Sequence, residues 1–212
     1  MIRKYFRLLV QLAFIIGYSC ANASPEVDFF RAVTIDNERA VVALLAQGLD
    51  PNTPSEQGQR GLFLALREGS AKVAAVLLAH PAILVDATNK ANETALMMAA
   101  LRGNLEWTRR LIERGAAVNR SGWTPLHYAA SGPEVSVVRL LLDRGAQIDA
   151  SAPNRNTALM MAAGYGPEDS VALLLARGAN PKALNNRSML AADFARSGGR
   201  AALSERLEKA AQ

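Results

Sequence analysis

The chain has 212 residues, of which 50% are apolar and 20% are charged, a composition that supports one domain with a sizeable core and excludes wholesale disorder. Its formal net charge of +5 could suggest nucleic-acid binding, but three of its 24 basic residues lie within the first seven positions. The other charges alternate in sign, and no run of five basic residues is present to contact a phosphate backbone. We therefore expect no nucleic-acid partner.

Residues 1–23 have the three parts of a secretory signal peptide. A basic start is followed by an apolar stretch at 8–16, and the small residues Ala21 and Ala23 stand where a signal peptidase reads the chain. We expect cleavage after Ala23 and a periplasmic or secreted mature chain of residues 24–212. The apolar stretch is short for a bilayer and no later segment is apolar for 18 residues, so no membrane span is expected after cleavage.

Two alternatives remain open for this segment. It could be retained as an anchor or a buried helix, or Cys20 could be acylated after cleavage just before it. The residue three before Cys20 is Gly17, where a lipoprotein signal normally has Leu. Cys20 is the one cysteine of the chain, so cleavage after Ala23 would leave a product that cannot form disulfides and that tolerates an oxidising compartment.

The rest of the chain repeats with a period near 33 residues. The heptapeptide Thr-Ala-Leu-Met-Met-Ala-Ala occurs at 94–100 and again at 157–163, and Thr-Pro-Leu-His begins between them at Thr124. These anchors define six units, which begin near residues 27, 60, 94, 124, 157 and 190.

Two columns of this repeat are occupied without exception. Five positions past each origin stand Ala32, Ala65, Ala99, Ala129, Ala162 and Ala195. Seventeen positions past each origin stand Leu44, Leu77, Leu111, Leu141, Leu174 and Leu207. A small residue lets paired helices approach closely, whereas leucine fills the layer between units. We therefore expect Leu111→Ala or Leu141→Ala to cost roughly 2–5 kcal/mol, and Ala99→Leu to destabilise by overpacking.

Each unit reads as two short antiparallel helices followed by a loop. In the third unit, Thr94 is placed to cap the first helix, and Gly103 ends it. Residues 105–114 form the second helix, which Gly115 ends. Neither helix could bury its apolar side alone, so the units must stack. The fourth unit has a loop three residues short, which predicts a stunted finger at 120–123.

These features resemble the ankyrin-repeat family over about residues 26–212. The motifs that carry the resemblance are Thr124-Pro125-Leu126-His127, the Gly-Ala pairs at 115–116, 145–146 and 178–179, Asn119 and Asp149. The resemblance implies an all-α solenoid of about six helix–turn–helix units with short hairpin loops, a concave face that binds another protein, and a structural hydrogen bond from His127 to a neighbouring loop. We expect a monomer.

No catalytic, cofactor or metal site is indicated, and we expect no enzyme activity and no cofactor. His80 and His127 lack partners at metal-ligand spacing, and no nucleophile elbow or phosphate-binding glycine loop is present. His80 is expected to cap carbonyls at a helix end. The pairs Met97-Met98 and Met160-Met161 could be a thioether site for Cu(I) or an oxidant trap, but core packing is favoured and the pairs lie too far apart to share an ion.

The resemblance also implies partner contacts, at loop positions just before each origin and at helix positions seven and eight after it. The candidates are Arg67, Glu68, Lys90, Glu93, Leu101, Arg102, Arg120, Trp123, Asn154, Asn156, Tyr165 and Arg187. Tyr165 and Trp123 with nearby arginines have the composition of an interface centre, although Trp123 could equally cover its own loop.

The sequence thus predicts a non-enzymatic adaptor or scaffold that acts in the periplasm. Two further possibilities are an immunity protein that neutralises a toxin and a stress-protection factor that supports a peroxide-detoxifying enzyme. The sequence does not identify the partner, because partner-binding faces of such repeats vary in their residues.

Overall fold

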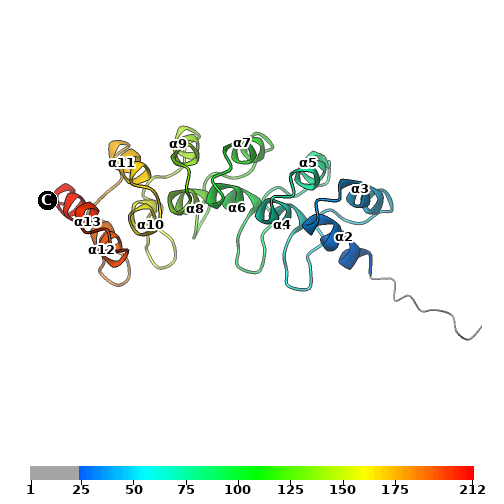
Figure 1. Cartoon of the computed structure of the whole chain (residues 1–212), viewed down its shortest axis with the longest axis horizontal. Coiled ribbons are helices and arrows are strands. Elements are labelled where there is room, and N and C mark those ends of the chain that lie inside the picture. The colour runs from blue at the N-terminus through cyan, green and yellow to red at the C-terminus, as the bar shows by residue number, and fades with distance from the viewer. Residues whose placement is uncertain (1–23) are drawn as a thin grey trace, which may run out of the picture.

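The computed structural model describes residues 24–212, which form twelve α-helices arranged as six antiparallel pairs (Figure 1). The first helices of the pairs are α2 (Pro25–Thr34), α4 (Gly61–Glu68), α6 (Ala95–Leu101), α8 (Pro125–Ser131), α10 (Ala158–Tyr165) and α12 (Ala191–Ser197). The second helices are α3 (Glu38–Ala46), α5 (Ala71–Ala79), α7 (Leu105–Glu113), α9 (Val135–Asp143), α11 (Glu168–Ala176) and α13 (Ala201–Ala210). The predicted signal peptide at 1–23 lies outside the described residues.

The helices begin and end where local chemistry favours it. Thr94 Oγ1 accepts a hydrogen bond from the Met97 backbone N–H at 3.3 Å and so caps α6, as predicted. The second helix of the same unit ends at Glu113, and Gly115 follows with a φ of 100°, a left-handed conformation that glycine adopts without a steric penalty. Within residues 24–212, no helix combines the length and the apolar character needed to cross a lipid bilayer.

The six pairs stack side by side into an elongated solenoid, with the first helices in one row and the second helices in another (Figure 1). All six members of the alanine column are buried, because each lies where one first helix packs against its neighbours. Leu77, Leu111, Leu141 and Leu174 are 0% exposed, whereas Leu44 at the end of the stack is half-buried. The predicted layers of small and large residues are confirmed.

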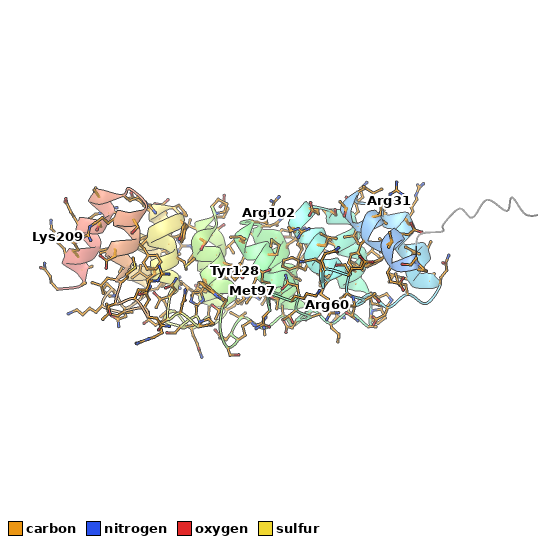
Figure 2. All side chains as sticks on the ribbon, turned by 90° about the horizontal axis from the view of Figure 1, so that it is seen from below. Arg31, Arg60, Met97, Arg102, Tyr128 and Lys209 are labelled. Atoms are coloured by element: carbon orange, nitrogen blue, oxygen red, sulfur yellow. The ribbon has the colours of Figure 1, made fainter. Side chains whose placement is uncertain are left out.

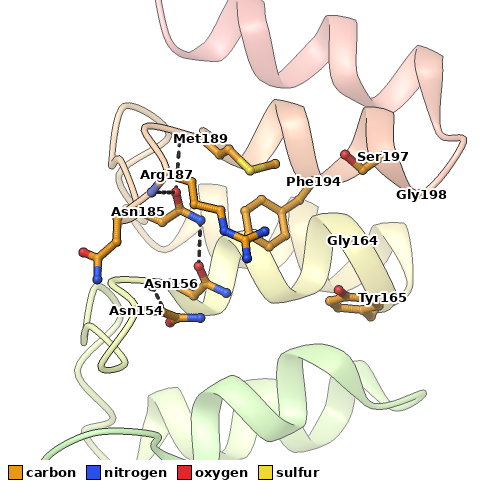
Figure 3. A pocket seen from close by; sticks show the side chains of 11 residues that line it. Asn154, Asn156, Gly164, Tyr165, Asn185, Arg187, Met189, Phe194, Ser197 and Gly198 are labelled. Carbon is orange, nitrogen blue, oxygen red and sulfur yellow. Dashed lines mark hydrogen bonds between the residues drawn. The ribbon is translucent and has the colours of Figure 1, made fainter.

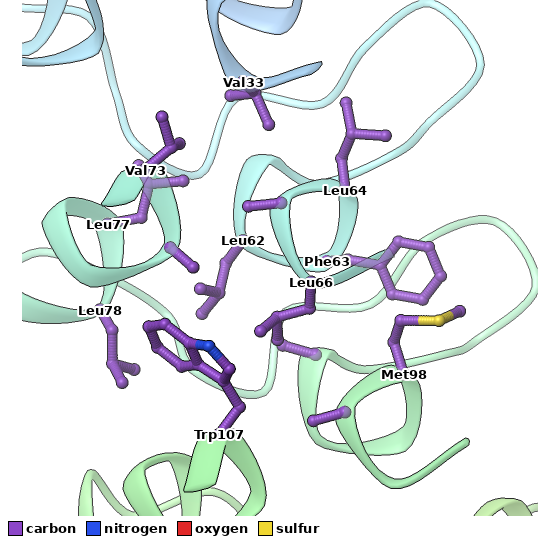
Figure 4. Packing of buried hydrophobic residues seen from close by; sticks show 14 of the residues in the cluster. Val33, Leu62, Phe63, Leu64, Leu66, Val73, Leu77, Leu78, Met98 and Trp107 are labelled. Carbon is purple, nitrogen blue, oxygen red and sulfur yellow. The ribbon is translucent and has the colours of Figure 1, made fainter. Parts of the chain in front are cut away.

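Core packing crosses the boundary between the second and third units. In Figure 4, Trp107 of α7 points toward Leu62 and Leu78, which belong to the preceding unit. Trp107 is buried on that side, and the Arg110 guanidinium lies 4.2 Å from the centroid of its ring. This contact of a tryptophan between two units was not predicted from the sequence.

Hydrogen bonds tie the base of each loop to the next unit. In each case a side-chain oxygen near the start of a loop accepts a backbone N–H from about one repeat further along. The pairs are Asn52 with Leu84 at 2.8 Å, Asp86 with Ala117 at 3.0 Å, Asn119 with Gln147 at 2.8 Å and Asp149 with Asn180 at 2.9 Å. This recurrence explains why an amide or acid stands at each of these positions.

Four of the loops fold into the same short finger. In each finger, a backbone N–H donates to the carbonyl four residues later: Ser55 to Gln59, Asn89 to Glu93, Ala152 to Asn156 and Asn185 to Met189, at 2.9–3.2 Å. The connection before α8 spans 114–124, whereas the one before α10 spans 144–157. The finger of the fourth unit is therefore stunted, as predicted, and Figure 1 shows its shorter loop.

The prediction for His80 is wrong. His80 follows α5, and its Nδ1 atom accepts a hydrogen bond from the Ala82 backbone N–H at 3.2 Å. The carbonyl of Leu78 is instead capped by Arg114 of the next unit, whose Nε donates to it at 3.2 Å. An arginine reaching across the unit boundary takes the place of the local cap that the sequence suggested.

Candidate protein-binding surface

The candidate contact residues lie on one side of the solenoid, which we call the inner face. It consists of the exposed sides of the first helices, together with the loops that precede α4, α6, α8, α10 and α12. Figure 2 views the molecule from this side. The second helices form the opposite, outer side.

Seven of the candidates are exposed on this face: Arg67, Glu68, Lys90, Arg102, Asn154, Tyr165 and Arg187. Arg67 and Glu68 form an ion pair with each other at 2.8 Å, and an exposed pair of this kind contributes little to stability. Lys90 Nζ donates to the Glu56 carbonyl at 3.0 Å across two fingers. Tyr165 is 69% exposed, more than any other large hydrophobic side chain among residues 24–212.

Glu93 and Arg120 are half-buried and serve the structure. The two carboxylate oxygens of Glu93 accept from Tyr128 Oη at 2.9 Å and from Asn89 Nδ2 at 2.8 Å. Burial, with the nearby carboxylate as a second cause, raises the pKa of Tyr128 well above its usual value, so the phenol stays a donor. Arg120 donates to Asn92 Oδ1 at 2.8 Å. Leu101 is also half-buried, packed against the core.

Trp123 covers its own loop. Its ring meets the rings of His127 and Tyr128 edge-on, with centroids 5.3 and 6.4 Å away. Trp123 keeps only part of its surface exposed in this position. Its contacts therefore favour the second of the two interpretations that the sequence left open.

His127 joins the fourth and fifth units, which confirms its predicted structural role. Its Nδ1 atom accepts from the Thr124 backbone N–H at 3.2 Å, and its Nε2 atom lies 2.9 Å from the Asn156 carbonyl oxygen. This arrangement fits a neutral ring that carries its proton on Nε2. Burial lowers the pKa of His127, which keeps the ring neutral.

Asn156 departs from the expectation of an exposed contact. It is only 7% exposed, and its Oδ1 atom accepts from Asn185 Nδ2 at 2.9 Å. Its backbone N–H donates to Asn154 Oδ1 at 3.1 Å, while its carbonyl faces His127. Asn156 thus links the fourth, fifth and sixth units and positions Asn154 on the inner face (Figure 3). A consensus position reports the place of a residue in the repeat but not how deeply it is buried.

A pocket of about 440 Å³ opens on the inner face between α10 and α12. It brings together Tyr165, Asn154 and Arg187, which the sequence proposed separately from two units (Figure 3). Its other lining residues are Asn156, Gly164, Asn185, Asn186, Met189, Phe194, Ser197 and Gly198.

Sequence reasoning missed Phe194, the aromatic floor of this pocket. The sequence did contain one indication of a close contact here, because Gly164 is a glycine inside the helix α10. A Cβ atom at that position would lie 3.4 Å from Cδ1 of Phe194, an ordinary van der Waals contact, so Gly164 lies directly beside the ring. A glycine inside a helix has a conformational cost, and such a residue often marks a close approach.

A second cavity of about 510 Å³ lies at the other end of the inner face, beside α2 and the first finger. Its charged lining residues are Glu26 and Glu56, and Phe30 and Val27 supply apolar surface. This cavity thus carries two carboxylates, whereas the charged residue of the pocket between α10 and α12 is Arg187.

Chemistry-bearing side chains do not converge in the part of the chain described here. Among residues 24–212, no three His, Cys, Asp or Glu side chains gather where they could hold a metal ion. Met97 and Met160 are 0% exposed, which confirms the packing interpretation of these residues. Both ring nitrogens of the buried His127 already have partners, the Thr124 backbone N–H and the Asn156 carbonyl.

Comparison with known proteins identifies the family. A family model described as ankyrin repeats in three copies matches residues 29–121, 81–152 and 117–185. The chain belongs to the ankyrin-repeat family, whose members generally serve as protein–protein interaction modules.

Individual relatives come from larger proteins. The nuclear factor NF-kappa-B p105 subunit of Gallus gallus is 32% identical over 161 residues, which cover 73% of this chain and 16% of that protein. A probable E3 ubiquitin-protein ligase, XBOS31 of Oryza sativa subsp. japonica, is 35% identical over 122 residues, 54% of this chain and 27% of the ligase. Alpha-latrotoxin-Lt1a of Latrodectus tredecimguttatus is 28% identical over 131 residues, 56% of this chain and 9% of the toxin. The chain spans about a quarter or less of these relatives.

Proposed function

We propose that this protein is a non-enzymatic adaptor that acts after export from the cytoplasm and binds another protein through its inner face. Membership of the ankyrin-repeat family supports the binding role. The composition of residues 1–23 supports export.

One observation carries the assignment of the face. Tyr165 presents 69% of its surface beside the pocket between α10 and α12, whereas the apolar positions of the same helix, such as Leu159 and Ala162, are 0–1% exposed. Aromatic residues beside a concave pocket are enriched at the centres of protein interfaces.

A pull-down with the full chain tests this face. The variant Tyr165→Ser with Arg102→Gln changes two exposed inner-face residues that make no hydrogen bond through their side chains within residues 24–212. We expect it to lose the partner that wild type retains while keeping the same helical circular dichroism. The matched control, Val42→Ser with Arg139→Gln, changes exposed residues of the outer helices and should retain the partner. Equal capture by both variants would contradict the assignment.

Export is tested separately by processing. If the chain is cut after Ala23, the purified protein begins at Ser24, and Ala23→Arg should leave a longer, unprocessed form. Cys20→Ser should change neither the mass of the mature protein nor its release in the periplasmic fraction. A fatty-acid mass that Cys20→Ser removes would instead establish the lipoprotein alternative. A wild-type chain found only in the cytoplasm would contradict export.

A further inference from the structure

The pocket between α10 and α12 has a distinctive charge. Among its lining residues Arg187 is the one that carries a formal charge, and none is acidic. Within residues 24–212, the Arg187 guanidinium makes no ion pair or hydrogen bond, although its backbone N–H donates to Asn185 Oδ1 at 2.8 Å. The nearest acidic residue of the same unit in sequence, Asp193, is already committed to the Leu190 backbone N–H and to Arg196.

From this arrangement we propose that the pocket binds an acidic side chain within an extended segment of the partner protein. The proposal rests on the proposed function and names the chemistry that the inner face recognises. Arg187 would pair with the carboxylate, since a guanidinium can offer two parallel N–H groups to a carboxylate in a fixed geometry.

The remaining lining groups suit the rest of such a segment. Asn154 receives the Asn156 backbone N–H on its Oδ1 atom, and this contact fixes the amide while its Nδ2 group stays free to donate. Asn186 lies beside it in the next finger, with its backbone N–H bonded to the Asn154 carbonyl at 3.0 Å. Side-chain amides both donate and accept, so they can bind the backbone of an extended peptide.

Apolar surface completes the pocket. Phe194 and Met189 are half-buried at its floor, and Tyr165 stands at its edge (Figure 3). These side chains can cover the methylene groups of a glutamate and an apolar neighbour in the same segment, and so exclude water from the ion pair. Gly164 and Gly198 also line the pocket.

The cavity at the opposite end of the inner face is unsuited to an acidic side chain. There the cavity beside α2 carries Glu26 and Glu56, which would repel a carboxylate. Burial of a like charge costs free energy, so a carboxylate is disfavoured in that cavity.

Selection of short random peptides displayed on phage, with the full chain as target, tests the proposal. We expect the selected peptides to be enriched in Asp and Glu next to an apolar residue. A synthetic copy of one such peptide should bind about tenfold more weakly to Arg187→Gln, as expected for loss of a charge-assisted hydrogen bond. Replacing its acid by the matching amide should weaken binding to wild type by a similar factor. Arg139→Gln, the same substitution on the outer side, should bind like wild type.

Four results would overturn the proposal. Peptides without acidic enrichment that still depend on Tyr165 would overturn the acidic preference but leave the inner face as the binding surface. Selected peptides whose binding is unchanged by substitution of Arg187, Tyr165 or Arg102 would contradict both the pocket proposal and the proposed function. A single-stranded oligonucleotide that binds with the same dependence on Arg187 would replace the acidic peptide by a nucleic acid. If no peptide is selected, the pocket proposal fails, and the pull-down alone decides the proposed function.

Discussion

The close stacking of first helices makes Gly166→Ala a sharp test of how the units pack. Gly166 follows α10, and a Cβ atom added to it would lie 2.0 Å from the carbonyl oxygen of Ala130 in α8. The φ of Gly166 is −90°, which alanine adopts freely, so the penalty arises from contact rather than from backbone strain.

The size of the effect follows from that distance. Carbon–oxygen contacts below 3.0 Å do not occur at a Cβ atom, so the two backbones must separate by about 1 Å. Such a gap forfeits a quarter to a half of the dispersion energy of the contacts it opens. Overpacking typically costs about 1–3 kcal/mol, and the lower chain entropy of alanine returns about 0.4–1 kcal/mol. Because backbone rather than a flexible side chain must move, we expect a net loss of about 2 kcal/mol.

Urea unfolding followed by circular dichroism measures this loss, and Gly178→Ala is the matched control. Gly178 has a φ of 89° and open space around its Cβ position, so alanine there meets only the left-handed penalty of about 1–2 kcal/mol, partly offset by the same entropy gain. Gly166→Ala should therefore be the more damaging change. If the Gly166→Ala variant is as stable as wild type, or more stable than the Gly178→Ala variant, then α8 and α10 do not pack as closely as the structure shows.

Three further predictions concern the stability of the solenoid. Leu141→Ala should lower the free energy of unfolding by about 2–5 kcal/mol, whereas Leu44→Ala should cost less because its side chain is half-buried; equal losses in urea titrations would contradict the layer model. Because burial lowers the pKa of His127, the unfolded chain binds the extra proton more readily, so the free energy of unfolding should fall as pH drops below about 6.5. His127→Asn should reduce this loss of stability, whereas His80→Asn should not. Unfolding free energies measured between about pH 7 and 5.5 test this, and equal pH dependence in the two variants would show that His127 is not the group responsible. Asn119→Ala should cost about 1–3 kcal/mol, because it removes both the 2.8 Å bond from Gln147 N–H and the 2.7 Å bond that Asn119 Nδ2 donates to the Gly145 carbonyl. An unchanged unfolding midpoint would show that these bonds between units do not stabilise the stack.

The helices and their layers could be predicted because they depend on periodic, local features. A threonine before a helix, a glycine after one and an alanine or leucine at a fixed position each act over a few residues or recur in every unit. Thr94, Gly115 and the buried alanine column therefore lie as the repeat predicts. Even the stunted finger before α8 follows from counting the residues that connect two helices.

The functional surface was less predictable because it depends on residues that break the repeat. Phe194 and Gly164 come from different units and meet only when α10 and α12 stack. Asn156 occupies a position expected to be exposed, yet three units share its hydrogen bonds. The ion-pairing state of Arg187 likewise depends on whether a carboxylate from another unit reaches it. Each of these properties is set by side chains that are not neighbours in sequence.

The proposed adaptor role requires that a partner protein contacts the inner face at Tyr165. A photo-crosslinking amino acid placed at residue 165 of the full chain tests it most directly in the producing cell. We expect a discrete crosslinked product at residue 165 and no such product at residue 42, which is exposed on the outer helix α3. Crosslinking to the same product from residue 42 and not from residue 165 would contradict it.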